Sequence, residues 1–134
     1  MPILLDSLQK AINSLERAIV RTREVPGDKE LRDAVIQRFE CTYELAWKML
    51  KRTLEHESPN PSEIDRLSFP DLMREGAERG IIADVEVWLE YRDQRNITSH
   101  TYDDKKAESV YKSAVVFFDD VKKLLKELKN RNSD

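Results

Sequence analysis

Lys29–His56 reads KELRDAVIQRFECTYELAWKMLKRTLEH, and apolar side chains recur in it every three or four residues. That spacing places them along one face of an α-helix. The buried face that it predicts consists of Leu31, Val35, Phe39, Thr42, Leu45, Ala46, Met49, Leu50 and Leu54. A long helix with one apolar face needs other helices to cover that face, so the chain is expected to be helical throughout.

Similar patterns on both sides predict further helices, which are separated by short breaks rich in proline, glycine or aspartate. Ser58–Ser62 is one such break, and Glu63–Leu67 is interpreted as loop or one short turn. Ser68 is expected to cap a helix, and Gly80 to end it. The sequence therefore predicts one domain over residues 1–134, an all-α antiparallel four-helix bundle with an additional short helix. Its helices are Ile3–Glu24, Lys29–His56, Ser68–Arg79, Asp84–Ser99 and Asp103–Asn130.

Composition limits the functional classes that fit the chain. Hydrophobic residues make up 40% of the sequence and charged residues 37%, as expected for a small helical protein with charged outer faces. No apolar run approaches the roughly 20 residues that cross a bilayer. The net charge of -3 argues against a general nucleic-acid coat protein. The single cysteine, Cys41, excludes an internal disulfide, fits a reducing cytoplasm and is expected in the core.

Residues 95–102, RNITSHTY, bring a guanidinium, an amide, hydroxyls, an imidazole and a phenol close together in the chain. At about 100° per residue, the apolar stripe that begins at Val85 continues into polar side chains. These are Arg92, Asn96 and Ser99, with Arg95 slightly further round. Because a buried guanidinium without a partner is costly, this end of the helix is expected to open into a cleft or to face a second subunit. A solvated helix end is the alternative.

The octet has the groups needed to cleave a phosphodiester. His100 can exchange protons near neutral pH, and Arg95 can hold a phosphate. Asn96 and Ser99 can add orienting hydrogen bonds. On one straight helix, however, Arg95 and His100 would lie about 140° apart, so His100 is expected at or beyond the helix end. No metal or cofactor is predicted, because the only other histidine, His56, has no ligand spacing to His100.

Two stretches together resemble a known family, namely Arg38–Lys51 and Trp88–Tyr102. They are similar to the HEPN superfamily, in the branch of nucleotidyltransferase substrate-binding proteins that is related to the HepT toxins of HEPN–MNT pairs. The resemblance covers nearly the whole chain. It implies an all-α bundle that forms a homodimer, and a minimal nucleotidyltransferase (MNT) as partner protein.

The resemblance also implies roles for single residues. In HEPN ribonucleases the arginine and histidine of the motif, here Arg95 and His100, form an RNA-cleaving cleft from two subunits, and Asn96 matches the polar residue after the arginine. In HepT-type toxins a tyrosine two residues after the histidine accepts AMP from the MNT antitoxin. Tyr102 holds that position, and a nucleotidyl group on it would block RNA by charge and volume.

Glu44 on the second helix is a further candidate, because a carboxylate there can pair with Arg92 or Arg95 and orient it; the other interpretation is an exposed acid. The leading hypothesis is a metal-independent endoribonuclease toxin that an MNT antitoxin silences. The alternative is a non-catalytic subunit that binds a nucleotide or substrate for the nucleotidyltransferase, which the acidic net charge favours. A structural interaction module is a third possibility, against which the intact motif argues.

Overall fold

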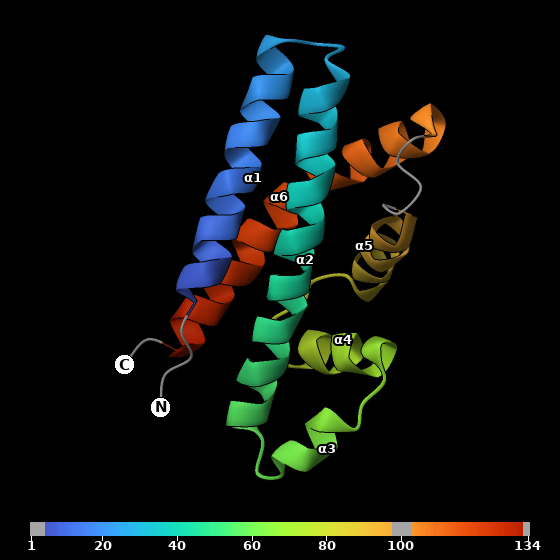
Figure 1. Cartoon of the computed structure of the whole chain (residues 1–134). Helices are drawn as coiled ribbons and strands as arrows, with labels where there is room; N and C mark the ends of the chain where they lie inside the picture. The colour runs from blue at the N-terminus through green and yellow to red at the C-terminus, as the bar shows by residue number, and fades with distance from the viewer. Residues whose placement is uncertain (1–4, 98–102, 133–134) are drawn as a thin grey trace.

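The computed structural model describes residues 5–97 and 103–132, and in those ranges the chain is all-α. The described residues form six helices, which Figure 1 shows in chain order. Their bounds are α1 (Asp6–Glu24), α2 (Lys29–Glu57), α3 (Pro61–Asp65), α4 (Phe69–Glu78), α5 (Val85–Ile97) and α6 (Asp104–Asn132). No described helix is long and apolar enough to span a membrane.

The long helices α1, α2 and α6 pack against one another through their apolar faces. Figure 1 shows α1 and α2 as an antiparallel pair, and α6 runs antiparallel to α1. The turn between α1 and α2 contains Gly27, whose φ of +87° suits glycine. Asp28 then caps α2, because its Oδ1 accepts hydrogen bonds from the amides of Glu30 at 2.9 Å and Leu31 at 3.1 Å. The apolar stripes predicted for these helices thus form the core, although Leu31 and Leu45 of α2 are only partly buried.

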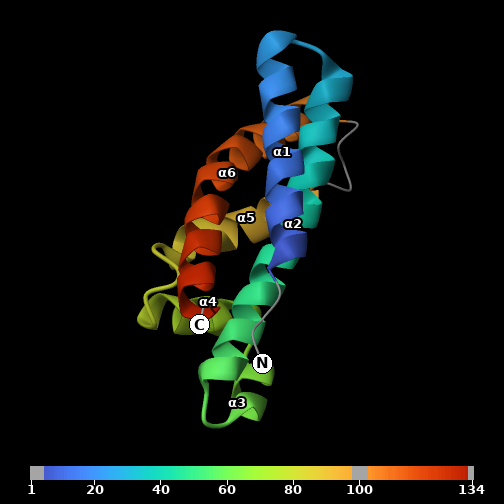
Figure 2. The same ribbon diagram turned by 90° about the vertical axis from the view of Figure 1, so that its left-hand side faces the viewer.

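The shorter helices lie against the second half of α2 (Figure 2). Ser68 caps α4 by accepting a hydrogen bond from the amide of Asp71 at 3.2 Å, and Gly80 ends it with a φ of +79°. The short helix α3 begins at Pro61, a residue that sequence analysis assigned to a break. Proline is tolerated there because the first turn of a helix needs no intrahelical amide donor.

An aromatic cluster holds α5 between α2 and α6. Phe117 of α6 lies 5.1 Å from both Phe39 and Tyr91, measured between ring centroids, and 5.7 Å from Trp88. Tyr43 of α2 stacks on Trp88 at 6.2 Å. The Tyr91 hydroxyl also donates a hydrogen bond to Asp120 of α6. These contacts fix the rotation of α5 and therefore determine which of its side chains face outward.

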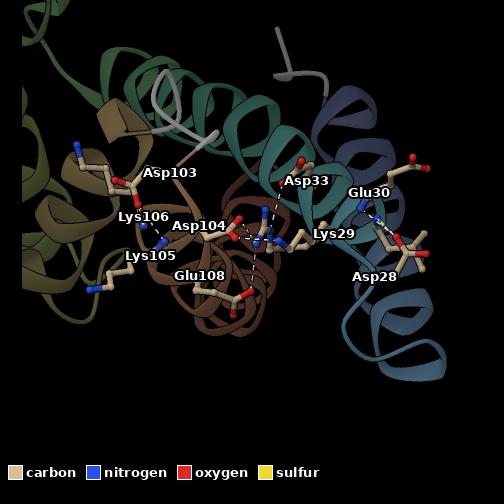
Figure 3. Close-up of polar contacts among 11 residues, drawn as sticks. Asp28, Lys29, Glu30, Asp33, Asp103, Asp104, Lys105, Lys106 and Glu108 are labelled. Carbon is tan, nitrogen blue, oxygen red and sulfur yellow. Dashed lines mark hydrogen bonds and ion pairs between the residues drawn. The ribbon is translucent and has the colours of Figure 1, made fainter.

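A charged cluster joins the beginnings of α2 and α6. The guanidinium of Arg32, which is 8% exposed, lies 3.2 Å from Asp33, 3.5 Å from Asp104 and 3.4 Å from Glu108. Lys29 also pairs with Asp104 at 2.8 Å. Figure 3 shows these carboxylates turned toward the space between the two helices. The cluster anchors α6 where it begins, just after the undescribed residues 98–102.

One core prediction was wrong. Cys41 is exposed on α2, although an apolar pattern surrounds it. Its neighbours Phe39, Thr42 and Tyr43 are buried. Two residues after Phe39, position 41 is rotated about 200° away from it and so faces solvent.

Candidate functional site

A cavity of about 360 Å³ lies where the end of α5 meets α2 and α4. Its wall contains the cations Lys51, Arg92 and Arg95 and the carboxylate Glu44. The remaining lining residues are Tyr43, Trp47, Leu67, Phe69, Leu72 and Asn96. Cationic and aromatic groups around an open cavity suit an anionic ligand that has a flat apolar part.

Helical spacing explains why these side chains meet. On α2, Glu40, Glu44, Trp47 and Lys51 follow one another at intervals of three or four residues, so they share one face. On α5, Arg92, Arg95 and Asn96 share the face that turns toward them. The aromatic cluster holds both helices in this rotation.

Arg95 is the central cation of the cavity. Its Nε lies 2.9 Å from Glu44 Oε1, and one of its terminal nitrogens lies 3.7 Å from Glu40 Oε1. Glu44 is in turn fixed by Trp47, whose indole nitrogen donates a hydrogen bond to Oε2 at 3.2 Å. The Arg95 side chain keeps 35% of its surface exposed, so an anion in solvent can reach it. The pairing expected between Glu44 and an arginine of α5 is thus present with Arg95.

Arg92 does not lie where the helical period placed it, on the inward-facing stripe of the helix. It is exposed at the mouth of the cavity, with its guanidinium 4.6 Å from the centre of the Phe69 ring. The buried residues of α5 are Trp88 and Tyr91. Tyr91 was not part of the predicted inward-facing stripe. Among the described polar residues, the expectation of a cleft holds for Arg92, Arg95 and Asn96, which all line the cavity.

Tyr43 is the cavity residue whose environment is most unusual. Its side chain is 1% exposed, and among the described residues no group hydrogen-bonds to its hydroxyl. Burial raises the pKa of the phenol well above its ordinary value of 10, and the opposing effect of Arg92 is smaller. Sequence reasoning assigned no role to Tyr43, nor to Lys51 or Phe69. Tyr43 and Lys51 are ordinary positions of the long helix α2, and Phe69 is an ordinary position at the start of α4. No sequence pattern therefore marked them as site residues.

Ser99, His100 and Tyr102 lie outside the described residues, so their positions relative to Arg95 remain predictions. The described part of α5 ends at Ile97. Within residues 5–97 and 103–132, no three His, Cys, Asp or Glu side chains gather closely enough to hold a metal ion.

A second cavity, of about 580 Å³, lies at the turn between α1 and α2. It is larger, and its cations Arg32 and Lys29 pair with the carboxylates of the charged cluster. Pairing does not distinguish the two cavities, because in the first one Arg95 pairs with Glu44 and Lys51 with Asp65. Its two hydroxyls, on Thr22 and Tyr111, bond to each other at 2.8 Å. The Arg95 cavity is the better candidate site because it contains Arg95 and Asn96 of the sequence motif and the aromatic side chains of Trp47 and Phe69.

Comparisons with known proteins bear on the family and the fold of the chain. A family model described as nucleotidyltransferase substrate binding protein like matches residues 4–130. A Haemophilus influenzae protein named probable ribonuclease HepT is 39% identical over 137 residues, which covers 96% of this chain and 93% of the relative.

Two solved structures share the fold. One, from Haemophilus influenzae, is described as revealing the fold of a substrate-binding domain of a nucleotidyltransferase. It superposes with a TM-score of 0.88 at 38% identity and covers 94% of this chain and 99% of its own. A crystal structure from Thermus thermophilus gives a TM-score of 0.76 at 28% identity, with 91% and 98% covered. The resemblance seen in the sequence is thus confirmed, and the chain belongs to the HEPN-like family of nucleotidyltransferase substrate-binding proteins.

Proposed function

We propose that the protein is a metal-independent endoribonuclease of the toxin type, whose activity a minimal nucleotidyltransferase partner silences. The observation that carries this proposal is the placement of Arg95. It lies in an open cavity with two further cations, five residues before His100 in the chain. The relative named probable ribonuclease HepT supports the same activity.

The proposed reaction needs only the RNA and side chains of this protein. A base, for which His100 is the candidate, takes the proton of the 2′-hydroxyl, and the 2′-oxygen attacks the adjacent phosphorus. The bond from phosphorus to the 5′-oxygen breaks, and that oxygen receives a proton from an acid. The products are a 2′,3′-cyclic phosphate and a 5′-hydroxyl. Arg95 would neutralise the charge that builds up on the phosphoryl oxygens, and Asn96 and Ser99 would orient the phosphate.

Glu44 would act as a positioning residue for Arg95. Its carboxylate holds the Nε side of the guanidinium, while Trp47 holds the carboxylate. The terminal nitrogens are the part of the guanidinium that can form a two-point contact with a phosphate. Arg92, at the cavity mouth, would supply a second phosphate contact.

The active form would be a homodimer in which the bundle of α1, α2, α5 and α6 meets a second copy. Arg95 and His100 from both subunits would then line one cleft. This arrangement concentrates positive charge locally, which answers the objection that the chain carries a net charge of -3.

Cleavage of RNA by purified protein in the presence of EDTA tests the proposal. Wild-type protein is expected to cleave, and Arg95→Ala and His100→Ala are expected to lose at least about a hundredfold in rate while they keep the helical circular dichroism spectrum. Lys10→Ala, which removes a cation on the exposed face of α1, serves as the matched control. Equal cleavage by both site variants would show that a contaminating nuclease is responsible.

A second candidate function is a non-catalytic subunit that presents a nucleotide or substrate to the nucleotidyltransferase. The family description favours it, as does the pairing of Arg95 with two carboxylates, which compete with a phosphate for the guanidinium. It predicts nucleotide binding without RNA cleavage in the same EDTA assay.

Silencing through Tyr102 can be tested by co-expression with a nucleotidyltransferase encoded beside the gene. Intact mass is expected to rise in steps of one AMP, and the rise is expected to disappear in Tyr102→Phe. An unchanged wild-type mass would favour the second candidate function over the toxin.

A further inference from the structure

The buried hydroxyl of Tyr43 needs an explanation. Buried polar groups in proteins almost always have a hydrogen-bond partner, and each exception calls for a physical reason, such as a ligand that supplies the partner. The Tyr43 side chain lines the Arg95 cavity. The charges with the largest influence on it are those of Arg92, Glu44 and Arg95, which lie around the same cavity. Among the described residues its hydroxyl has no hydrogen-bond partner, so a ligand in the cavity that displaces the atoms covering it would meet an unused donor.

The wall next to Tyr43 is aromatic. Trp47 and Phe69 meet edge to face, with their ring centroids 5.9 Å apart, and both are only partly buried. Tyr43 lies 6.2 Å from Phe69. The guanidinium of Arg92 covers the Phe69 ring, although Arg92 itself is exposed and its side chain can move aside. A flat ligand could therefore replace the guanidinium on this ring.

We propose that the Arg95 cavity is a subsite for one unpaired nucleobase. The base stacks on Phe69 in the place of the Arg92 guanidinium, and its edge accepts a hydrogen bond from the Tyr43 hydroxyl. The displaced Arg92 moves toward the phosphate of the same nucleotide, beside Arg95. The inference rests on the proposed function, because it takes the phosphate near Arg95 to belong to RNA.

The size and chemistry of the cavity favour a single unpaired base over a duplex. About 360 Å³ holds one nucleotide, whereas a paired base would bring its complement with it. Bases that proteins read in RNA are usually unstacked, lie on aromatic or guanidinium planes and are hydrogen-bonded at their edges. Phe69, Arg92 and Tyr43 supply these three kinds of group. RNA is then expected to be cleaved at single-stranded positions, with a preference for the base that fits.

Titration of the four nucleoside 3′-monophosphates into ¹⁵N-labelled protein tests the subsite. The signal is the indole N–H cross-peak of Trp47, assigned with Trp47→Phe. At least one nucleotide is expected to shift this peak to saturation. Ribose 5-phosphate, which has a phosphate and no base, is expected to bind at least roughly tenfold more weakly. Equal binding of ribose 5-phosphate, or no shift with any of the four nucleotides, would overturn the proposal.

Two tyrosine variants form a matched pair. Tyr43→Phe is expected to weaken the preferred nucleotide roughly tenfold, because it removes only the proposed donor. Tyr91→Phe removes a hydroxyl of the same aromatic cluster that already bonds to Asp120, and it is expected to leave the affinity unchanged. Wild-type affinity in Tyr43→Phe would overturn the assignment of this hydroxyl.

The binding assay separates this inference from the proposed function. A protein that binds a nucleotide in this way but leaves RNA intact supports the subsite and overturns the ribonuclease. A protein that cleaves RNA in EDTA, with the same base preference in wild type and Tyr43→Phe, supports the ribonuclease and overturns the subsite.

Discussion

Replacing Tyr43 with phenylalanine is expected to raise the free energy of unfolding, although most changes to a buried residue lower it. The Tyr43 hydroxyl is buried without a hydrogen-bond partner among the described residues. Such a group costs about 1–3 kcal/mol in the folded state, because it gives up its bonds to water and gains none. Removing the hydroxyl recovers part of that cost, so a gain of about 1 kcal/mol is expected.

Tyr91 provides the internal comparison. It is 3% exposed, against 1% for Tyr43, and its ring packs in the same cluster. Its hydroxyl, however, donates to the Asp120 carboxylate. A hydrogen bond to a charged group contributes about 1.5–3 kcal/mol, so Tyr91→Phe is expected to lower the free energy of unfolding by that amount. The same chemical change at two equally buried rings is thus expected to have opposite signs.

Urea unfolding followed by circular dichroism at 222 nm measures both variants, and thermal unfolding gives a second reading. For a chain of 134 residues, 1 kcal/mol corresponds to about 3–4 °C in Tm. Tyr43→Phe should therefore unfold at a higher temperature and urea concentration than wild type, and Tyr91→Phe at lower values of both. A loss of about 1 kcal/mol or more in Tyr43→Phe would refute the reasoning, since it would mean that the hydroxyl has a stabilising partner.

Three further predictions concern charge. Burial raises the pKa values of Tyr43 and Tyr91 in the folded state, so their contribution to stability is complete below the unfolded pKa of 10 and is lost as the pH rises above it. An absorbance titration at 295 nm should show that both phenols ionise only when the protein unfolds. Ionisation of all four tyrosines near pH 10 in folded protein would contradict this. Arg32→Ala should lower the free energy of unfolding, measured in urea, by about 1–3 kcal/mol, because it removes a nearly buried aliphatic side chain and its ion pairs. The loss should be smaller at high salt, which screens the ion pairs. An unchanged urea midpoint would contradict the prediction. Glu44→Gln should change the free energy of unfolding by less than about 1 kcal/mol, because the pair of Glu44 with Arg95 is partly exposed. It should nevertheless lower kcat for RNA cleavage several-fold with little change in KM. A change in KM alone would mean that Glu44 does not orient the guanidinium.

The sequence predicted the long helices well because their apolar periodicity is strong. Lys29–His56 was predicted and α2 runs Lys29–Glu57, and the caps at Ser68 and Gly80 lie where turn chemistry placed them. The short helix α3 was not predicted as a helix: its first residues were assigned to the break Ser58–Ser62 and the rest to a loop or one short turn, since five residues are too few to show a period. Cys41 was misplaced because it was assigned to the apolar pattern around it, although the helical period rotates position 41 about 200° away from Phe39.

The candidate site was predictable in the two arginines of α5 and less so in Lys51 and in its walls. The polar run on α5 pointed to Arg92 and Arg95, and a carboxylate of α2 was expected beside one of them. Tyr43 and Phe69 could not be found in this way. Tyr43 reads as an ordinary core aromatic, and the lack of a partner for its hydroxyl among the described residues emerges only when α2, α4 and α5 are packed together.

Cleavage of a short RNA with a single 2′-deoxy substitution, in EDTA, tests the proposed chemistry most directly. The scissile position is first mapped on the unmodified RNA, where the wild-type products are expected to end in a 2′,3′-cyclic phosphate and to be absent with Arg95→Ala. A 2′-deoxy sugar on the 5′ side of that position should abolish cleavage there, because it removes the attacking oxygen. Undiminished cleavage of the substituted RNA, or products that need added Mg²⁺, would contradict a metal-independent reaction at the Arg95 cavity.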